Sequence, residues 1–378
     1  MKILYLTDQL YRHGGIEKVL TQKVNYLADI AGDQVTVLTY QQEGRPPVYE
    51  LSDKVRIRDL NINYEIGKSY FSLTNLLKIP AHISALRNTI RQVQPDVIVS
   101  CSFGPDFYFL PFVCGKIPVI KEFHSTRYFA DKANKITSQV MRKLNDYVET
   151  QYTRLIVLNE DEKPFYKSAN VEIIPNPAEF PSQYCPLTEH KIISAGRITS
   201  QKNFEDLVNV SQRLQTNFPD WQIHIYGDDY LDRKASIEKK ILELNLENQI
   251  QFKGTTSDLK RTFLNYSIYA MTSNHETFPM VLLEALSVGL PVVSYRCPTG
   301  PDRIITHGED GFIVPYKNLD IFTKKLEKLM TDENLRRKMG AKGRDNVQRF
   351  NIDTVMQQWR TLFEQVITQK NPQCQPQP

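Results

Sequence analysis

The feature that most restricts the fold of this chain is the alternation of short apolar runs with amphipathic stretches along most of its length. In the first half, the apolar runs 3–6 and 34–40 alternate with the helical patterns 16–30 and 70–93, the second of which Pro80 should break or kink. Strands that alternate with helices form parallel βαβ units with right-handed crossovers. The pattern therefore predicts an α/β fold on parallel sheets.

A proline-rich segment divides this alternation into two halves. Four prolines fall within the twelve residues 175–186, which is typical of a linker. The same alternation then restarts, and the chain ends in three consecutive helical patterns at 318–330, 333–347 and 352–367. We predict two doubly wound, Rossmann-like domains, over 1–180 and 181–350, with a cleft between them at the carboxyl ends of both sheets. A Pro/Gln-rich tail, 371–378, should be disordered.

Composition limits the functional classes. The 378 residues are 41% hydrophobic and 24% charged with a net charge of +4, which fits a folded protein and suggests no nucleic-acid partner. Five scattered cysteines without a CxxC spacing favour reduced thiols in the cytoplasm over disulfides or a structural zinc. The first apolar run is too short for a signal peptide, and no run reaches membrane-spanning length. If this protein meets a membrane, we expect it to lie on the surface.

Two segments are candidates for such a surface contact. The run 116–143 holds seven basic residues against two acidic ones, which indicates either a solvated helix face or a contact with an anionic acceptor or bilayer. The segment 70–77, YFSLTNLL, is either part of an ordinary amphipathic core helix or a second piece of the same contact.

The stretch 268–293 has the clearest functional pattern. A buried strand at 268–271 leads into a polar loop with Glu276, and Pro279 opens a helix that carries Glu284 and ends at Gly289. Ligands of open α/β sheets bind outside the carboxyl ends of strands, where helix N-termini attract phosphate. A carboxylate beside a phosphate site can accept hydrogen bonds from sugar hydroxyls, so this pattern indicates a sugar-phosphate ligand.

Other candidate residues follow strands in the same way. Gly14 and Gly15 precede the first long helix and either let backbone N–H groups approach a diphosphate or form a plain tight turn. Arg197 and Lys202 follow the first strand of the second half, where two cations near a helix start indicate either an anion or ordinary surface charge. His124 follows another strand and is either structural or catalytic. Asp228, Asp229 and Asp232 fit a solvated turn better than a metal site.

These residues together resemble a known family. Glu276-TFPMVLL-Glu284 resembles the E-x7-E motif of retaining glycosyltransferases of family 4, which have the two-Rossmann architecture called GT-B. The segment 195–203 resembles the family's Gly-Arg…Lys segment, and 282–293 its LLEA…G-PVV continuation. The resemblance covers most of the chain in the expected order. It implies a glycosyltransferase whose last helix, 351–370, crosses back to the N-terminal domain.

The resemblance also implies roles for individual residues. Arg197 and Lys202 would bind the donor diphosphate, Glu284 the ribose, and the Gly14–Gly15 turn a phosphate. The Glu276 carboxylate would bind hydroxyls of the donor sugar, assisted by backbone N–H groups of Thr277 and Phe278. His124 would lie near the sugar and the reacting centre. Catalysis would thus rest on His124, Arg197, Lys202 and Glu276, without a metal or other cofactor.

The segment 297–302, CPTGPD, resembles a loop of family members that build bacterial surface polysaccharides and lipid-linked oligosaccharides from UDP-sugars. This implies a UDP-hexose or UDP-N-acetylhexosamine donor and a lipid-linked glycan acceptor, at the inner face of the cell membrane. The chain departs from the family where Asp229 replaces a glycine and where Thr277 and Pro279 replace two others. A UDP-sugar epimerase of the same architecture and a catalytically silent nucleotide-sugar-binding subunit remain as alternatives.

Overall fold

The computed structural model describes residues 1–65, 67–102, 104–128, 136–229 and 232–370. The chain divides into two compact units, which are described separately here. Unit 1 comprises Met1–Pro177 together with Ile352–Pro378, and unit 2 comprises Ala178–Asn351. The predicted tail 371–378 lies outside the described residues.

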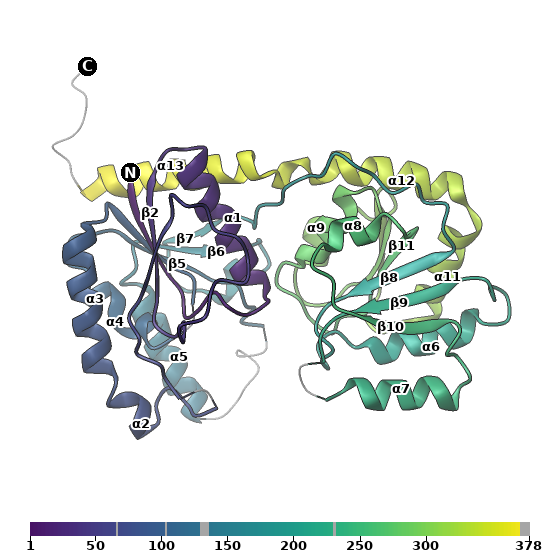
Figure 1. Cartoon of the computed structure of the whole chain (residues 1–378), viewed down its shortest axis with the longest axis horizontal. Coiled ribbons are helices and arrows are strands. Elements are labelled where there is room, and N and C mark those ends of the chain that lie inside the picture. Colours follow the sequence, from purple (N-terminus) through teal and green to yellow (C-terminus); the bar gives the residue numbers. More distant parts are fainter. Residues whose placement is uncertain (66, 103, 129–135, 230–231, 371–378) are drawn as a thin grey trace, which may run out of the picture. The chain divides into compact units, whose positions relative to one another are not determined.

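Unit 1 is built on a seven-stranded sheet in which every pair of neighbouring strands is parallel. Its order is β3-β2-β1-β4-β5-β6-β7, where the strands are β1 Lys2–Leu6, β2 Gln34–Thr39, β3 Arg56–Asp59, β4 Val97–Ser100, β5 Val119–Glu122, β6 Arg154–Val157 and β7 Val171–Ile173. Helices flank the sheet (Figure 1): α1 Gly15–Asp29, α2 Leu73–Leu76, α3 Ile79–Val93, α4 Asp106–Val113, α5 Ile136–Glu149 and α13 Ile352–Lys370.

Unit 2 repeats this design with six parallel strands. Its order is β10-β9-β8-β11-β12-β13, where the strands are β8 Lys191–Ala195, β9 Gln222–Tyr226, β10 Ile250–Gly254, β11 Ile268–Met271, β12 Val292–Tyr295 and β13 Gly311–Val314. Its helices are α6 Phe204–Leu214, α7 Lys234–Glu243, α8 Leu259–Phe263, α9 Met280–Ser287, α10 Pro301–Ile304, α11 Leu319–Thr331 and α12 Glu333–Asn346. The prediction of two doubly wound α/β sheets is confirmed.

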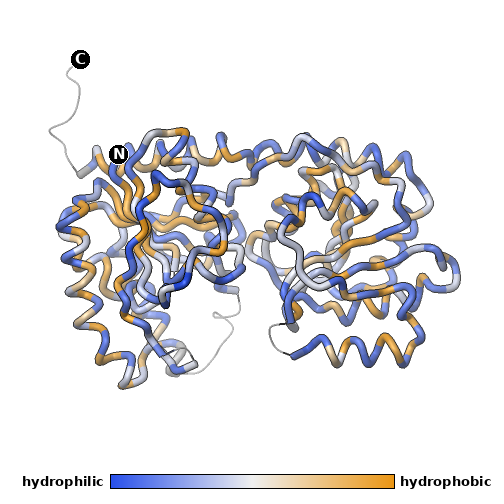
Figure 2. Tube along the Cα trace, in the orientation of Figure 1, coloured by the Kyte–Doolittle hydropathy of each residue, from blue (hydrophilic) through white to orange (hydrophobic). Residues whose placement is uncertain are grey.

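The strands are apolar on both faces because helices cover both faces. In β1, Ile3 and Tyr5 belong to a core with α1 and α13, whereas Leu4 and Leu6 belong to a second core with α3 and α4. Figure 2 shows this as mainly hydrophobic strands within each unit and hydrophilic connections around them. Among the described residues, no helix is long and apolar enough to cross a membrane.

In unit 1, a proline determines where helix α3 begins, and a tryptophan anchors helix α13 in the core. Pro80 sits in the first turn of α3, where its missing N–H costs nothing, so the predicted pattern 70–93 divides into the four-residue helix α2 and the longer α3. The final helix α13 packs on the sheet of unit 1, and its Trp359 is completely buried in that core.

The described basic residues of the run 116–143 do not all lie on the surface. Lys121 is fully buried on β5, where its ammonium donates to the side chain of Ser100 over 3.1 Å. The Arg127 guanidinium pairs with Glu149 and lies 4.2 Å from the centre of the Tyr166 ring. Lys132 and Lys135 lie outside the described residues. A count of charges along the sequence overlooks that side chains of a buried strand face the interior.

Candidate functional site

The candidate site of unit 2 lies where the strand order of its sheet reverses. The chain adds β9 and β10 on one side of β8, and then β11, β12 and β13 on the other. The loops that leave the carboxyl ends of β8 and β11 therefore diverge, and such a switch point is where doubly wound sheets bind ligands. Arg197 and Lys202 follow β8, and Glu276 follows β11, so one sheet edge carries all three.

The structure brings Lys202 and Glu276 into direct contact. The Lys202 ammonium donates to Oε1 of Glu276 over 2.6 Å, and the two side chains are only 16% and 8% exposed. The stem of Lys202 packs on Gly196, where φ is +151° and a Cβ atom would lie 2.8 Å from Cε of Lys202. A glycine is thus needed at position 196 for two reasons: the backbone has a positive φ, and a side chain there would collide with the stem of Lys202.

Arg197 is an exposed cation of this edge. The described part of the chain offers its guanidinium neither a hydrogen bond nor an ion pair. The neighbouring turn is equally tight, because a Cβ atom on Gly227 would lie 1.9 Å from the carbonyl oxygen of Gly196. An available guanidinium on the same sheet edge as a paired ammonium is suited to receive a diphosphate.

The CPTGPD segment holds the loop of Glu276 in place. The Glu276 amide donates to the carbonyl of Pro298 over 2.9 Å, and the Glu276 carbonyl accepts from the amide and hydroxyl of Thr299 over 2.6 and 3.0 Å. Gly300 has φ of +89°, and a Cβ atom there would lie 2.6 Å from the carbonyl oxygen of Thr277. Sequence reasoning missed this support, although the Thr-Gly-Pro turn was its signal.

Glu284 lies in α9 and is 4% exposed. Its charge and that of Glu276 both reach the hydroxyl of Tyr269, which donates to the carbonyl of Ala195 at the end of β8 over 3.2 Å. Burial raises the pKa of Tyr269, and the two carboxylates raise it further. Both predicted glutamates therefore lie on the side of the sheet where β8 ends.

Phe278, another predicted contact of the donor sugar in this loop, has its side chain buried. The ring of Phe278 is 6% exposed and packs edge-on against Phe350, with ring centres 5.4 Å apart. Its side chain is thus part of the interior, so Phe278 could meet a ligand only through its backbone.

The aspartates after β9 have a structural explanation. The carboxylate of Asp229 accepts from the amides of Arg233 and Lys234 over 2.9 and 3.2 Å, at the start of α7. A carboxylate that satisfies free N–H groups of a helix start stabilises that helix. The replacement of a family glycine by Asp229 therefore supplies a cap for α7.

In unit 1 the predicted glycines open α1. Gly14 caps the helix with extended backbone and Gly15 is exposed at its first position, so free N–H groups face outward there. The carboxylate of Glu17 lies where a Cβ atom on Gly14 would be, and it accepts a hydrogen bond from Gln9. The helix start thus already carries a negative side chain.

His124 belongs to a buried polar cluster behind β5. Its Nε2 lies 3.4 Å from Oε1 of Glu122, whose Oε2 accepts from the Lys23 ammonium over 2.6 Å. The thiol of Cys101 lies 3.4 Å from the same oxygen. Cys101, Glu122 and His124 bring sulfur, oxygen and nitrogen within 4.8 Å of one another, but the cation of this cluster is already the Lys23 ammonium.

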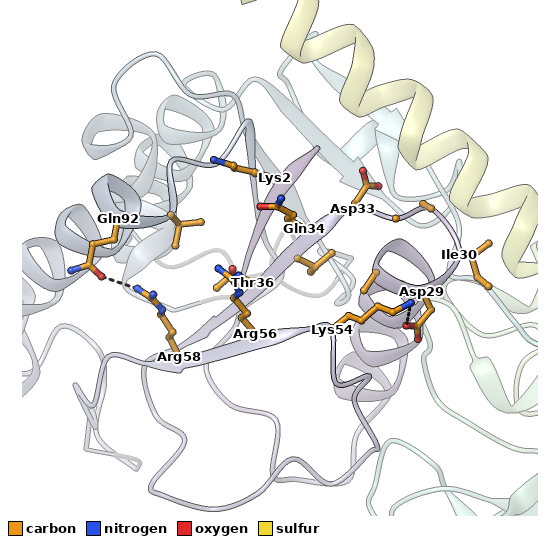
Figure 3. Close-up of a pocket in the computed structure, with 15 residues that line it drawn as sticks. Lys2, Asp29, Ile30, Asp33, Gln34, Thr36, Lys54, Arg56, Arg58 and Gln92 are labelled. Carbon is orange, nitrogen blue, oxygen red and sulfur yellow. Dashed lines mark hydrogen bonds and ion pairs between the residues drawn. The ribbon is translucent and has the colours of Figure 1, made fainter.

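A separate cavity of about 520 Å³ lies at the opposite edge of the same sheet (Figure 3). Lys2, Arg56 and Arg58 line it, together with the ends of α1 and α3. Lys54 pairs with Asp29 over 3.3 Å, and Arg58 donates to Gln92 over 2.7 Å. Cations complement the negative ends of helices, so these charges stabilise the fold without implying an anionic ligand.

Known protein families match both parts of the chain. Residues 13–179 match the family model "Glycosyltransferase Family 4", and residues 176–346 match "Glycosyl transferases group 1". The amylovoran biosynthesis glycosyltransferase AmsD of Erwinia amylovora is 25% identical over 96% of this chain and 99% of its own length.

Two further proteins are similar over their full length. The GalNAc-alpha-(1->4)-GalNAc-alpha-(1->3)-diNAcBac-PP-undecaprenol alpha-1,4-N-acetyl-D-galactosaminyltransferase of Campylobacter jejuni is 23% identical over 97% of this chain and 99% of its own. The structure of Anabaena HepE in complex with UDP superposes with a TM-score of 0.76 at 16% identity, over 97% of this chain and 100% of that one.

Two parallel doubly wound sheets with a polar switch point define an α/β protein of the GT-B class. Within that class, the two matched models place the chain in glycosyltransferase family 4, to which it belongs.

Proposed function

We propose that this protein is a retaining glycosyltransferase that moves a hexose or N-acetylhexosamine from a UDP-sugar to a hydroxyl of a glycan acceptor. The observation that carries the proposal is the grouping of exposed Arg197 with the Lys202–Glu276 pair at the switch point of unit 2. Cations beside a carboxylate match the two parts of such a donor, a diphosphate and a sugar. The UDP complex of the similar HepE supports uracil as the base.

The mechanism follows from the charge that develops when the donor breaks. The departing UDP gains negative charge on its diphosphate, which Arg197 and Lys202 stabilise without a metal ion. Glu276 holds hydroxyls of the sugar, and His124 of unit 1 contacts that sugar in the reacting complex. The acceptor hydroxyl enters on the face that the diphosphate leaves, with its proton passing to the departing phosphate, so the configuration at the anomeric carbon is retained.

A donor screen with point variants tests this proposal. Incubation with UDP- and GDP-sugars should release free UDP slowly, whereas an isomerised sugar would indicate an epimerase and binding without turnover a silent subunit. Arg197→Ala and Lys202→Ala should lower kcat far more than they raise KM, because both cations act on charge that appears in the transition state. Arg213→Ala, which removes a surface partner of Asp320, is the matched control. An effect confined to KM would contradict the mechanism.

We further propose a lipid-linked acceptor, used at the inner face of the cell membrane in bacterial surface-polysaccharide synthesis. The undecaprenol-linked substrate in the name of the Campylobacter relative and the amylovoran assignment of AmsD support this. The structure supplies an apolar surface of unit 1, here called the α2–α5 surface, which consists of Tyr70, Phe71, Leu73, Leu76, Leu77, Phe112, Val140, Leu144 and Tyr147, all exposed.

Contacts between helices unite this surface. The ring of Phe71 lies 5.5 Å from that of Tyr108 on α4, and the Tyr108 hydroxyl donates to Asn145 on α5 over 3.1 Å. Leu73 and Leu77 are 74% and 72% exposed, so the interpretation of 70–77 as an ordinary core helix is wrong. The elements that carry these apolar residues also bear exposed cations, Lys116 after α4 and Lys143 in α5, which favours an anionic bilayer.

Co-sedimentation with vesicles tests the membrane proposal. Wild-type protein should bind phosphatidylglycerol-containing vesicles in a salt-sensitive manner and bind phosphatidylcholine vesicles weakly. Leu73→Glu with Leu77→Glu should abolish sedimentation, whereas Ile30→Glu, at a 70% exposed position elsewhere in unit 1, should not change it. Equal loss in both variants would contradict the assignment of the surface.

A further inference from the structure

The loop of unit 2 that carries Lys202 is fastened to the loop that carries Glu276. The loops, 196–203 and 272–279, begin next to each other because β8 and β11 are neighbouring strands (Figure 1). Within the first loop, the amide of Lys202 donates to the carbonyl of Thr199 over 3.1 Å and so closes a turn. That bond shapes the turn, whereas the place of the turn on the sheet edge depends on contacts with other segments.

Asn274 supplies two of those contacts. Its backbone amide donates to the carbonyl of Gln201 over 2.7 Å, and its side-chain Nδ2 donates to the carbonyl of Ser200 over 2.6 Å. In the opposite direction, Nε2 of Gln201 donates to the carbonyl of His275 over 3.0 Å. The two loops are therefore joined in both directions, through residues that immediately precede the two members of the ion pair.

A third strand fixes the direction in which the amide of Asn274 points. Tyr316, in the loop after β13, donates from its hydroxyl to Oδ1 of Asn274 over 2.9 Å. A side-chain amide offers an acceptor at one atom and a donor at the next, so with Oδ1 occupied, Nδ2 is directed at the carbonyl of Ser200. Neither aspartate nor leucine provides this combination without a charge or a lost bond. Asn274 thus ties together loops from three strands of one sheet edge.

The deeper part of this junction does not involve Asn274. Thr272, which is 1% exposed, donates from its hydroxyl to the carbonyl of Asn203 over 2.9 Å. In turn, Nδ2 of Asn203 donates to the carbonyl of Thr272 over 3.2 Å, at the residue that precedes α6. Loss of the Asn274 side chain should therefore leave α6 and the strands in place and loosen only the outer part of the loop, with Lys202.

We propose that Asn274 is a positioning residue that holds Lys202 against Glu276 and so sets the place where the ammonium meets a diphosphate. The proposal rests on the proposed function in one respect, namely that Lys202 receives the diphosphate of the donor. A loop that is already fastened keeps its charge in position as the reaction proceeds, whereas a loose loop must first be ordered. A misplacement of about 1 Å can lower a rate by about a hundredfold, so even partial loosening should be visible in kcat.

A double-mutant cycle in the protein without substrate tests the positioning. Asn274→Leu keeps the branched shape of asparagine, loses both side-chain hydrogen bonds and adds no charge. Lys202→Met alone should lower the melting temperature by about 2–4 °C, because the carboxylate of Glu276 loses its partner at 2.6 Å. In the Asn274→Leu background the same replacement should lower it by less than about half as much, because the pair is no longer held together. Equal shifts in the two backgrounds would overturn the proposal.

Turnover adds a measurement that a purely structural role would not change. With the UDP-sugar found in the donor screen, Asn274→Leu should lower kcat about tenfold and change KM less than about twofold, because Lys202 acts on charge that develops in the transition state. In the Lys202→Met background, Asn274→Leu should change kcat less than about twofold. A tenfold loss in both backgrounds would show that Asn274 does not act through Lys202 and would contradict the proposal.

A matched control lies in unit 1. Nδ2 of Asn170 donates to the carbonyl of Tyr152 over 2.6 Å, and its Oδ1 accepts from the hydroxyl of Ser168, so this amide makes the same kind of junction. Asn170→Leu should shift the melting temperature equally with and without Lys202 and should leave kcat unchanged. If Asn274→Leu does not fold, Tyr316→Phe replaces it in both cycles, with effects in the same direction but smaller, because it removes only the bond to Oδ1.

The melting cycle needs no substrate, so the two levels of inference fail differently. Coupled shifts for Asn274 and Lys202, without release of UDP from any UDP-sugar, would leave the positioning in place and refute the proposed function. Turnover of a UDP-sugar together with additive effects on the melting temperature and on kcat would refute the positioning alone.

Discussion

Replacement of Glu276 by glutamine should make UDP bind more tightly while it slows sugar transfer. The ammonium of Lys202 is bound to Glu276 over 2.6 Å, so a diphosphate must compete with that carboxylate for the lysine. Glutamine keeps an acceptor of the same length and removes the charge. The lysine is then easier to transfer to the phosphate, whereas the sugar loses its charged hydroxyl acceptor.

The burial of the pair sets the size of the effect. A hydrogen bond to a charged group contributes about 1.5–3 kcal/mol, and the neutral amide keeps part of it, which leaves roughly 1–1.5 kcal/mol to be released. The side-chain exposures of 16% and 8% leave some screening, so the lower part of this range is the better expectation. The dissociation constant for UDP should therefore fall about fivefold.

Isothermal titration calorimetry with UDP measures this directly, and kcat with the UDP-sugar found in the donor screen measures the loss of transfer. Glu189→Gln is the matched control, because Glu189 pairs with Lys191 over 2.7 Å in the same unit, at 44% and 35% exposure, away from the switch point. An unchanged or weaker affinity of Glu276→Gln for UDP would refute the idea that the diphosphate takes Lys202 from Glu276.

Three stability predictions follow from other contacts. Gly300→Ala should destabilise unit 2 more than Gly308→Ala in thermal unfolding: both have φ near +90°, but only at Gly300 would a Cβ atom meet backbone, at 2.6 Å. Asp229→Ala should cost about 0.5–2 kcal/mol in urea unfolding through the lost cap of α7. Burial lowers the pKa of His82 to about 4, so between about pH 6.5 and 4 the unfolded chain binds a proton at His82 and the folded protein does not. The free energy of unfolding should therefore fall as the pH drops through this range, by up to about 1.4 kcal/mol per pH unit. The fall should be smaller in His82→Phe.

The sequence was sufficient to predict the sheets and the edge where candidate residues gather. Apolar runs bounded by turns identify buried parallel strands, and the residues after such strands must lie at the carboxyl edge. Lys202 and Glu276 are 74 residues apart, yet they were assigned to one site because each follows a strand. Their direct ion pair was not predictable, since the order of neighbouring strands leaves side-chain directions open.

Contacts between loops and the faces of buried strands were beyond the sequence pattern. The hydrogen bond from Thr299 to the carbonyl of Glu276 joins two irregular segments. Such segments have no periodic pattern of apolar residues from which the contact could be predicted. Lys121 and Glu122 are neighbours in β5 and so point to opposite faces, where Lys121 joins Ser100 and Glu122 joins Lys23. A count of charges over the run 116–143 treats Lys121 as a surface residue, because such a count does not show which residues of a strand are buried beneath helices.

The two buried lysine–glutamate pairs differ in what a ligand can do to them. The Lys23–Glu122 pair is 1% and 2% exposed and has an aromatic face behind the cation, so separating its charges would cost about 3–5 kcal/mol with nothing at hand to replace either partner. The Lys202–Glu276 pair has the same length, but it is more exposed and lies on the sheet edge that carries Arg197. In the proposed mechanism, an arriving diphosphate would replace the carboxylate that Lys202 gives up, and sugar hydroxyls would replace the ammonium that Glu276 gives up. The first pair is therefore suited to hold the surrounding side chains in place, and the second, in the proposed mechanism, to exchange its partner for a substrate.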